Sequence, residues 1–183
     1  MSKYFIFIPN FLSILRIALI YPILENLLGK DFIMSLIFFA IASLTDALDG
    51  FLARRMSWQT ELGKILDPVA DKLLLTGTIF ILWVSEYIPL YIFIIFFSRD
   101  VAILVGAAVQ MTLIESNAPL PNILGKLTTA LQIAYIFIII LFELLGISIS
   151  LVVLDVSIVI VTLMSLVVYA YNWYYDIKAY HNE

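Results

Sequence analysis

Residues 45–72 read TDALDGFLARRMSWQTELGKILDPVADK and contain four aspartates in two pairs. Asp46 and Asp49 are three residues apart, and Asp67 and Asp71 are four residues apart. Residues at either spacing lie on one face of an α-helix. If the first pair ends one helix and the second pair begins the next, the short segment between them brings the two helix ends together. The stretch therefore predicts an antiparallel helix pair with four carboxylates at one end.

The sequence on both sides of this stretch is strongly apolar. Of 183 residues, 63% are hydrophobic and 13% are charged, and the mean hydropathy is +1.08. At about 20 apolar residues for each membrane crossing, this composition supplies roughly five or six spans. Lipid leaves no water for free backbone groups, so each span is expected to be α-helical. We predict an all-α integral membrane protein with six transmembrane helices in a single domain over residues 1–183, the helices lying at 10–28, 32–53, 63–84, 87–113, 121–143 and 149–174.

The same composition excludes several classes of protein. So few charged residues exclude a soluble globular enzyme, a disordered chain and a nucleic-acid-binding domain, so membrane lipids rather than nucleic acid are the expected partners. The chain has no Cys and a single His, His181. Disulfides, thiol catalysis, a Ser-His-Asp relay and a multi-His metal site are therefore not expected.

Lysine and arginine are distributed unevenly along the predicted spans, and these residues favour the cytoplasmic side of a membrane. With the N-terminus inside, the outer side holds only Lys30, whereas the inner ends and loops hold Lys3, Arg16, Arg54, Arg55, Lys64, Lys72, Lys126 and Lys178. The first residues resemble neither a secretory signal nor an Arg-rich transit peptide. We expect a multi-pass protein of a prokaryotic cytoplasmic membrane, with the aspartates facing the cytoplasm.

Four carboxylates in a low dielectric repel one another, so protons or cations must offset their charge. The stretch offers oxygen ligands without His or Cys, which is typical of sites for Mg²⁺, Mn²⁺ or Ca²⁺. Two divalent ions would balance four aspartates, and Mg²⁺ keeps coordination positions that phosphate oxygens fill. The alternative is that these acids are solvated charges at helix ends, although acids within membrane spans usually mark function.

The stretch resembles the signature of the CDP-alcohol phosphatidyltransferases without departure, in the pattern Asp46-x2-Asp49-Gly50-x2-Ala53-Arg54-x8-Gly63-x3-Asp67-x3-Asp71. The first predicted span is similar to the first helix of that family, in the pattern Pro9-Asn10-x2-Ser13-x2-Arg16. The resemblance therefore covers essentially the whole chain.

The resemblance implies transfer of a phosphatidyl group from CDP-diacylglycerol to an alcohol, with release of CMP, in anionic phospholipid synthesis. It implies two ions, Mg²⁺ or Mn²⁺, held by Asp46, Asp49, Asp67 and Asp71. Asp71 is also implied as the catalytic base that takes the hydroxyl proton. A homodimer is implied as well. The CDP-lipid site is implied to comprise Asn10, Gly50, Ala53, Arg54 and Gly63.

Charged residues outside this stretch are candidates for binding the acceptor. Arg99 and Asp100 are neighbours inside the predicted fourth span, and Lys126 lies at the inner end of the fifth. We expect Arg99 and Lys126 to bind the phosphate of the acceptor, because charges within spans usually serve function. The alternatives are that Arg99 only neutralises Asp100 and that Lys126 is an interfacial anchor.

Two groups within the family differ at nearby positions. Phosphatidylglycerolphosphate synthases typically carry a second arginine where this chain has Ala107, and a second lysine where it has Thr128. The chain looks more like the cardiolipin synthases of the family, whose acceptor, phosphatidylglycerol, carries one negative charge. Fewer cations suit fewer charges, so phosphatidylglycerol is the favoured acceptor and glycerol 3-phosphate the alternative.

Two rival classes also place aspartates in membranes. A membrane prenyltransferase normally has its two motifs much farther apart in a longer chain, whereas Asp49 and Asp67 are only 18 residues apart. A divalent-metal transporter would place acids along a pore at mid-depth, whereas these acids fall at helix ends. The enzyme is therefore the preferred interpretation.

Overall fold

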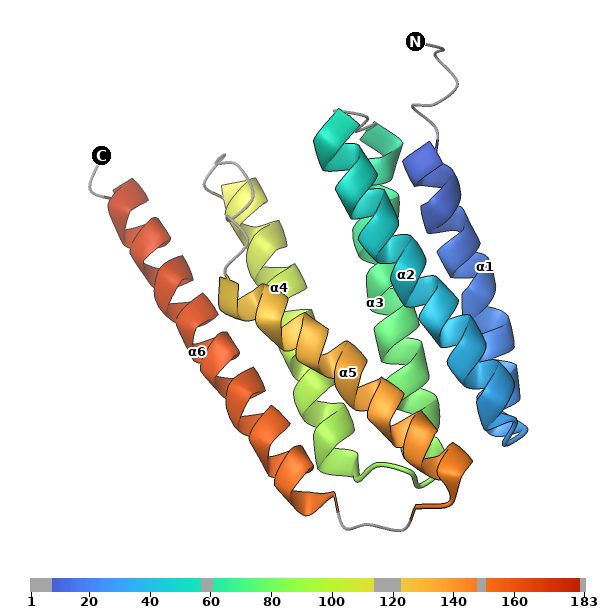
Figure 1. Ribbon diagram of the computed structural model, residues 1–183. Coiled ribbons are helices and arrows are strands. Elements are labelled where there is room, and N and C mark those ends of the chain that lie inside the picture. Colours follow the sequence, from blue (N-terminus) through green and yellow to red (C-terminus); the bar gives the residue numbers. More distant parts are fainter. Residues whose placement is uncertain (1–7, 57–60, 114–122, 148–150, 182–183) are drawn as a thin grey trace. The chain divides into compact units, whose positions relative to one another are not determined.

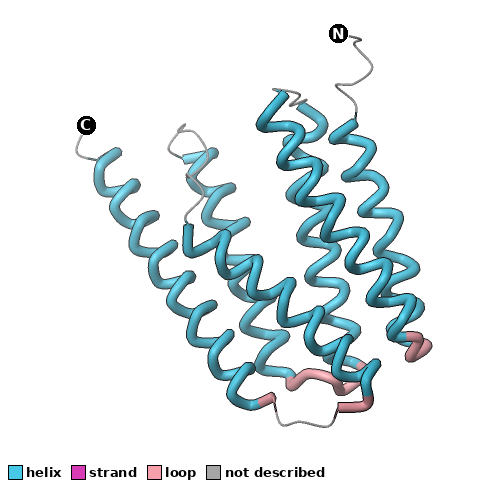
Figure 2. The backbone as a smooth tube through the Cα atoms, in the orientation of Figure 1, coloured by secondary structure: helices cyan, strands magenta, loops and turns pink. Residues whose placement is uncertain are grey.

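The computed structural model describes residues 8–56, 61–113, 123–147 and 151–181, without the side chains of 8–9, 49–56, 61–66, 68, 107–108, 110–113, 123 and 176–181. In these ranges the chain forms helices joined by turns, and no strand (Figure 2). The six helices are α1 (Ile8–Leu28), α2 (Phe32–Met56), α3 (Glu61–Val84), α4 (Leu90–Leu113), α5 (Ile123–Leu145) and α6 (Val152–His181).

The prediction of six helices is confirmed, and most of their ends lie within about three residues of the predicted ones. The end of α6 is the exception, because this helix continues to His181 instead of stopping at 174. The prediction ended the span where charged residues interrupt the apolar run. Charge limits burial in lipid but does not stop a helix, and no Pro or Gly follows before His181.

Among the residues that the structure describes, three helical segments are each long and apolar enough to cross a membrane: Asn10–Leu28, Leu124–Leu145 and Val152–Tyr175. Within the described residues, α2 contributes a shorter apolar segment, Phe32–Leu48. Many large apolar side chains point away from the interior, among them Phe11, Leu44, Val153 and Val167. Water disfavours so much exposed apolar surface, whereas lipid accepts it. The prediction of an all-α integral membrane protein is confirmed.

Internal contacts divide the chain into two compact units, so that a single domain over 1–183 stays a prediction. The first unit comprises Met1–Ile88 and Tyr135–Ser148, and the second comprises Pro89–Ala134 and Ile149–Glu183. In the first unit, α1 packs against both α2 and α3 (Figure 1). Its apolar core includes Ile23, Leu27, Phe39, Leu74 and Leu82, all nearly or fully buried.

Three helices of the first unit end in the same hydrogen-bonded turn. A residue with positive φ follows each of α1, α3 and α5, namely Lys30 (60°), Glu86 (64°) and Gly146 (63°). Each donates its N–H to the carbonyl three residues earlier, and the next residue donates to the carbonyl five residues earlier. These are the bonds of a Schellman motif, which normally uses glycine because positive φ strains other residues. Only Gly146 avoids that strain.

Only residues 29–31 connect α1 to α2. The Asp31 carboxylate accepts a hydrogen bond from the Met34 N–H at 3.1 Å, as a helix N-cap does. The tight turn between α1 and α2 makes these two helices antiparallel, and α3 runs antiparallel to α2 (Figure 1). The start of α1, the end of α2 and the start of α3 therefore lie at the other end of the unit (Figure 1).

In the second unit, α4 packs against α6, and the two helices run in the same direction (Figure 1). The Tyr169 hydroxyl donates to the Ile103 carbonyl at 3.2 Å, and the Tyr91 hydroxyl donates to Asp155 at 3.2 Å. A Cβ added at Gly106 would lie 2.7 Å from the Tyr169 hydroxyl oxygen. The missing side chain at Gly106 therefore lets Tyr169 cross α4 closely.

Candidate active site

Three of the four predicted aspartates meet one polar face of α1. The Ser13 hydroxyl donates a hydrogen bond to Asp67 Oδ1. Arg16 Nη1 lies 3.3 Å from Asp46 Oδ1 and also forms an ion pair with Asp71 Oδ1. Asp46, Asp67 and Asp71 therefore lie against the same face of α1, with Asp46 ten residues before the end of α2 and Asp71 ten residues after the start of α3.

Burial differs sharply between the two sides of this cluster. Arg16 is fully buried, with 0% of its side chain exposed, whereas the Asp46 and Asp71 side chains are 39% and 38% exposed. The guanidinium therefore lies beneath the carboxylates, and their other side is accessible. A buried cation beside the carboxylates lowers the repulsion between them.

Several predicted site residues have no described side chain. These residues belong to the helical backbone of α2 and α3 but lie outside the described side chains: Asp49, Gly50, Ala53, Arg54 and Gly63. Asn10 is described, and it is buried on α1 one turn before Ser13. Asn10, Ser13 and Arg16 follow one another at intervals of three residues, so they share a helix face.

The described side chains do not by themselves form a group of three or more acidic, His or Cys residues arranged around an ion. The donor chemistry nevertheless fits a hard cation, since the cluster offers carboxylate oxygens on an accessible side. Arg16 Nη1 already lies against one oxygen of Asp46 and one of Asp71, as a cation would. Asp49 is outside the described side chains, so the predicted set of four is described in part.

Sequence reasoning missed the role of Ser13 and Arg16 in this cluster. The positive-inside distribution accounts for Arg16 as a charge at the inner end of a span, and the family pattern includes Ser13 and Arg16 without giving them a role. Its spacing from Asn10 and Ser13 was the available signal, because three polar residues on one face of an apolar helix predict that the face is buried against polar partners.

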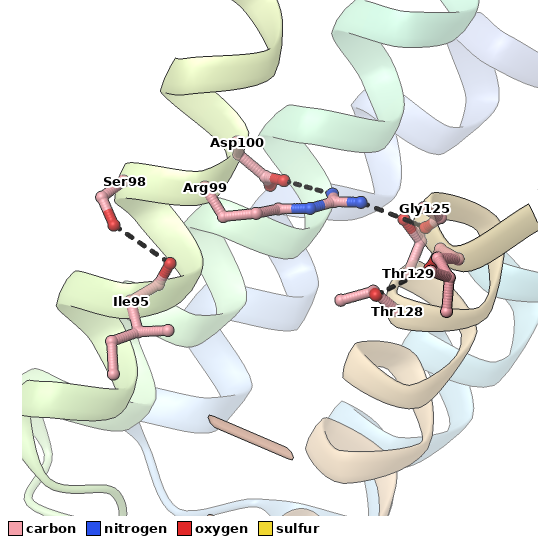
Figure 3. A network of polar contacts seen from close by, with 8 residues as sticks. Ile95, Ser98, Arg99, Asp100, Gly125, Thr128 and Thr129 are labelled. Atoms are coloured by element: carbon pink, nitrogen blue, oxygen red, sulfur yellow. Dashed lines mark hydrogen bonds and ion pairs between the residues drawn. The ribbon is translucent and has the colours of Figure 1, made fainter. Parts of the chain in front are cut away.

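A second polar network lies within the second unit (Figure 3). Arg99 of α4 is almost fully buried and donates from Nη1 to Asp100 Oδ1 at 2.7 Å. Its Nη2 donates to the Gly125 carbonyl at the start of α5, at 3.1 Å. The Thr129 hydroxyl donates to the same carbonyl at 3.2 Å. Arg99 therefore ties α4 to the first turn of α5.

The predicted acceptor residues differ in their surroundings. Arg99 and Asp100 form the ion pair of the self-neutralising alternative, yet the buried Arg99 Nε has no hydrogen-bond acceptor among the described residues. Lys126 is exposed. Thr128 is fully buried, and its hydroxyl donates to the Leu124 carbonyl at 2.8 Å.

The chain is similar to known proteins of one family. The chain matches the CDP-alcohol phosphatidyltransferase family over residues 6–174. It is 36% identical over 127 residues to the CDP-diacylglycerol--glycerol-3-phosphate 3-phosphatidyltransferase of Aquifex aeolicus, covering 67% of this chain and 68% of that protein. It is 33% identical over 143 residues to the protein of the same name from Bacillus subtilis, covering 69% and 72%.

A second group of relatives carries another name. The chain is 41% identical over 121 residues to the cardiolipin synthase (CMP-forming) of Rattus norvegicus, covering 65% of this chain. The match spans only 39% of that longer relative. Relatives of both names are thus similar to this chain at comparable identity, and the match to the family extends over nearly all of its length. The chain belongs to the CDP-alcohol phosphatidyltransferase family, whose members are membrane-integral enzymes.

Proposed function

We propose that this protein transfers a phosphatidyl group from CDP-diacylglycerol to phosphatidylglycerol, forming cardiolipin and releasing CMP. Glycerol 3-phosphate is the alternative acceptor. The observation that carries the proposal is the meeting of Asp46, Asp67 and Asp71 of α2 and α3 on one polar face of α1, with Asp46 and Asp71 partly exposed. A divalent-metal transporter remains the alternative of another class.

The proposed reaction is a direct displacement at phosphorus. The acceptor hydroxyl oxygen attacks the β-phosphorus, the bond between the two phosphates breaks, and CMP leaves with its electron pair. Asp71 takes the hydroxyl proton, for which a carboxylate within hydrogen-bond reach is sufficient. The accessible side of Asp71 supports this role, since a substrate hydroxyl can reach it there. No Cys or His nucleophile is needed.

We propose that Asp46, Asp49, Asp67 and Asp71 hold two ions of Mg²⁺ or Mn²⁺. When bound, these ions supply neutralisation of the diphosphate and of the departing CMP. Asn10, Gly50, Ala53, Arg54 and Gly63 are proposed to hold the CDP-lipid. The assignment of Asn10 to the CDP-lipid site is supported by its place on the same face of α1 as Ser13 and Arg16.

The Arg99 network supports a separate proposal for the acceptor. The Arg99 Nε–H is buried and lacks an acceptor among the described residues, and the Gln132 Oε1 of the same unit is also buried without a donor. Buried polar atoms normally have partners, so such atoms are suited to meet a polar ligand. We propose that Arg99 offers this N–H to an acceptor phosphate and that exposed Lys126 adds a charge.

CMP release should depend on both substrates and on metal. The purified chain in detergent micelles with CDP-diacylglycerol, Mg²⁺ and an acceptor should produce CMP and one new lipid, identified by mass spectrometry. EDTA should abolish the reaction, because the carboxylates cannot neutralise a diphosphate, and added Mn²⁺ should restore it. Metal uptake into vesicles without CMP release would instead favour the transporter.

We propose that the protein lies in a prokaryotic cytoplasmic membrane with its active site facing the cytoplasm, because the positive-inside distribution favours this orientation. We also propose that it is a homodimer. On this Cys-free chain, single cysteines at Ser57 and Asn117, both outside the described residues, should be labelled from the cytoplasmic side. A cysteine at Asn26, near the end of α1, should be labelled only from the outer side. Labelling of the Ser57 position from outside contradicts the proposed orientation.

A further inference from the structure

We infer that Arg16 occupies the place of a cation between Asp46 and Asp71 when no metal is bound, and that divalent ions compete with it for these carboxylates. The inference rests on the proposed function only in taking Asp46 and Asp71 as metal ligands. Arg16 is then a positioning residue that stabilises the metal-free enzyme and sets the metal concentration at which the site fills.

One nitrogen makes both contacts. Arg16 Nη1 lies 3.3 Å from Asp46 Oδ1 and is also paired with Asp71 Oδ1. These carboxylates come from α2 and α3, so a single positive group from α1 links all three helices of this packing. A cation shared between two carboxylates of different helices would lie in the same place.

The burial of these side chains indicates how a divalent ion would displace Arg16 from the carboxylates. The carboxylates are more than a third exposed, whereas Arg16 is fully buried among packed helices. A divalent ion can approach the carboxylates from their accessible side, but the Arg16 side chain has no exposed route away from them. The guanidinium therefore stays nearby, and its positive charge opposes the incoming ion.

Two possible roles of Arg16 predict opposite changes in metal affinity when Arg16 is removed. If Arg16 competes with the metal, its removal strengthens metal binding and destabilises the metal-free protein. If Arg16 instead orients the carboxylates for the metal, its removal weakens metal binding. Metal affinity therefore distinguishes the two roles without any measurement of turnover.

The test uses Arg16→Gln in the full chain in detergent, with Mn²⁺ binding followed by the electron paramagnetic resonance of free Mn²⁺. We expect Mn²⁺ to bind about tenfold more tightly than to the wild type, since one nearby positive charge is lost. In EDTA the Tm should be about 5 °C below the wild-type value, because the carboxylates lose their buried counter-ion. Saturating Mg²⁺ should close most of this gap.

Two variants serve as controls. Lys30→Gln removes one positive charge from an exposed position 14 residues along the chain, about 21 Å farther along the direction of α1. It should change neither Mn²⁺ affinity nor the dependence of Tm on metal. Arg16→Lys keeps the charge and should stay within about threefold of the wild-type Mn²⁺ affinity.

The outcomes separate this inference from the proposed function. If Mn²⁺ binds the wild type but binds Arg16→Gln no more tightly, the inference is contradicted and the proposed metal site is not. A wild type that binds no Mn²⁺ contradicts the proposed metal site and the inference with it. An Arg16→Gln protein that unfolds only after EDTA supports the inference, whereas equal instability with and without Mg²⁺ overturns it.

Discussion

Asp71→Asn is expected to lower the rate of CMP release by about 10³-fold or more, because asparagine cannot take the hydroxyl proton. The substitution preserves the shape of the side chain and leaves three of the four proposed ligands. It also removes a carboxylate that contacts Arg16 Nη1, so the metal site itself should be perturbed. Binding of CDP-diacylglycerol should be largely retained.

Asp46→Asn is the matched control for this prediction. Asp46 contacts the same Arg16 nitrogen and has nearly the same exposure as Asp71, but it is not the proposed base. Its loss should weaken metal binding, so that a higher Mg²⁺ concentration restores much of the rate. The same addition should not restore Asp71→Asn. Rates are measured as CMP released across a Mg²⁺ titration, and near wild-type turnover of Asp71→Asn contradicts the assignment of the base.

The helices were predictable because the apolar runs are long and the segments between them are short. The predicted ends at 28 and 84 are those of α1 and α3, although the usual glycine is missing from the turn position after each. Lys30 and Glu86 occupy the positive-φ position that glycine normally takes, and Gly29 only precedes Lys30. Only Gly146 marks its turn in the expected way.

The meeting of Asp46, Asp67 and Asp71 was predictable from the spacing of the aspartates and from the short segment that joins the two helices. The partnership with Arg16 was not predictable in the same way. An arginine near the cytoplasmic end of a span is equally well explained by the positive-inside rule. Only the packing of α1 against α2 and α3 distinguishes a buried counter-ion from an interfacial charge.

Phosphatidylglycerol is expected to be used in preference to glycerol 3-phosphate by a factor of about 10² to 10⁴. A charge-assisted hydrogen bond to a buried phosphate contributes roughly 1.5–3 kcal/mol. Without replacement, the two cations absent at Ala107 and Thr128 cost about 3–6 kcal/mol. At 1.4 kcal/mol for each factor of ten, this difference gives the expected range. The two acceptors are compared by competition at equal concentration, with lipid products identified by mass spectrometry.

The contacts within the second unit support this direction of preference. Asp100 already balances the charge of Arg99 at 2.7 Å, which leaves exposed Lys126 as the other cation of the proposed acceptor site. Thr128, where a second lysine would stand, is fully buried with its hydroxyl bonded to the Leu124 carbonyl. One net positive charge matches a phosphodiester, whereas a phosphate monoester carries about −1.5 to −2 at pH 7.

A charge added at Ala107 tests the physical reason for the preference. Ala107→Arg should raise the use of glycerol 3-phosphate relative to phosphatidylglycerol by about tenfold or more, since it restores one of the two cations. Ala107→Met adds a long side chain without charge and should leave the ratio unchanged, which separates charge from size. Predominant phosphatidylglycerophosphate from the wild type would overturn the cardiolipin assignment. The aspartate cluster and the class of reaction would be unaffected, because neither depends on which hydroxyl attacks.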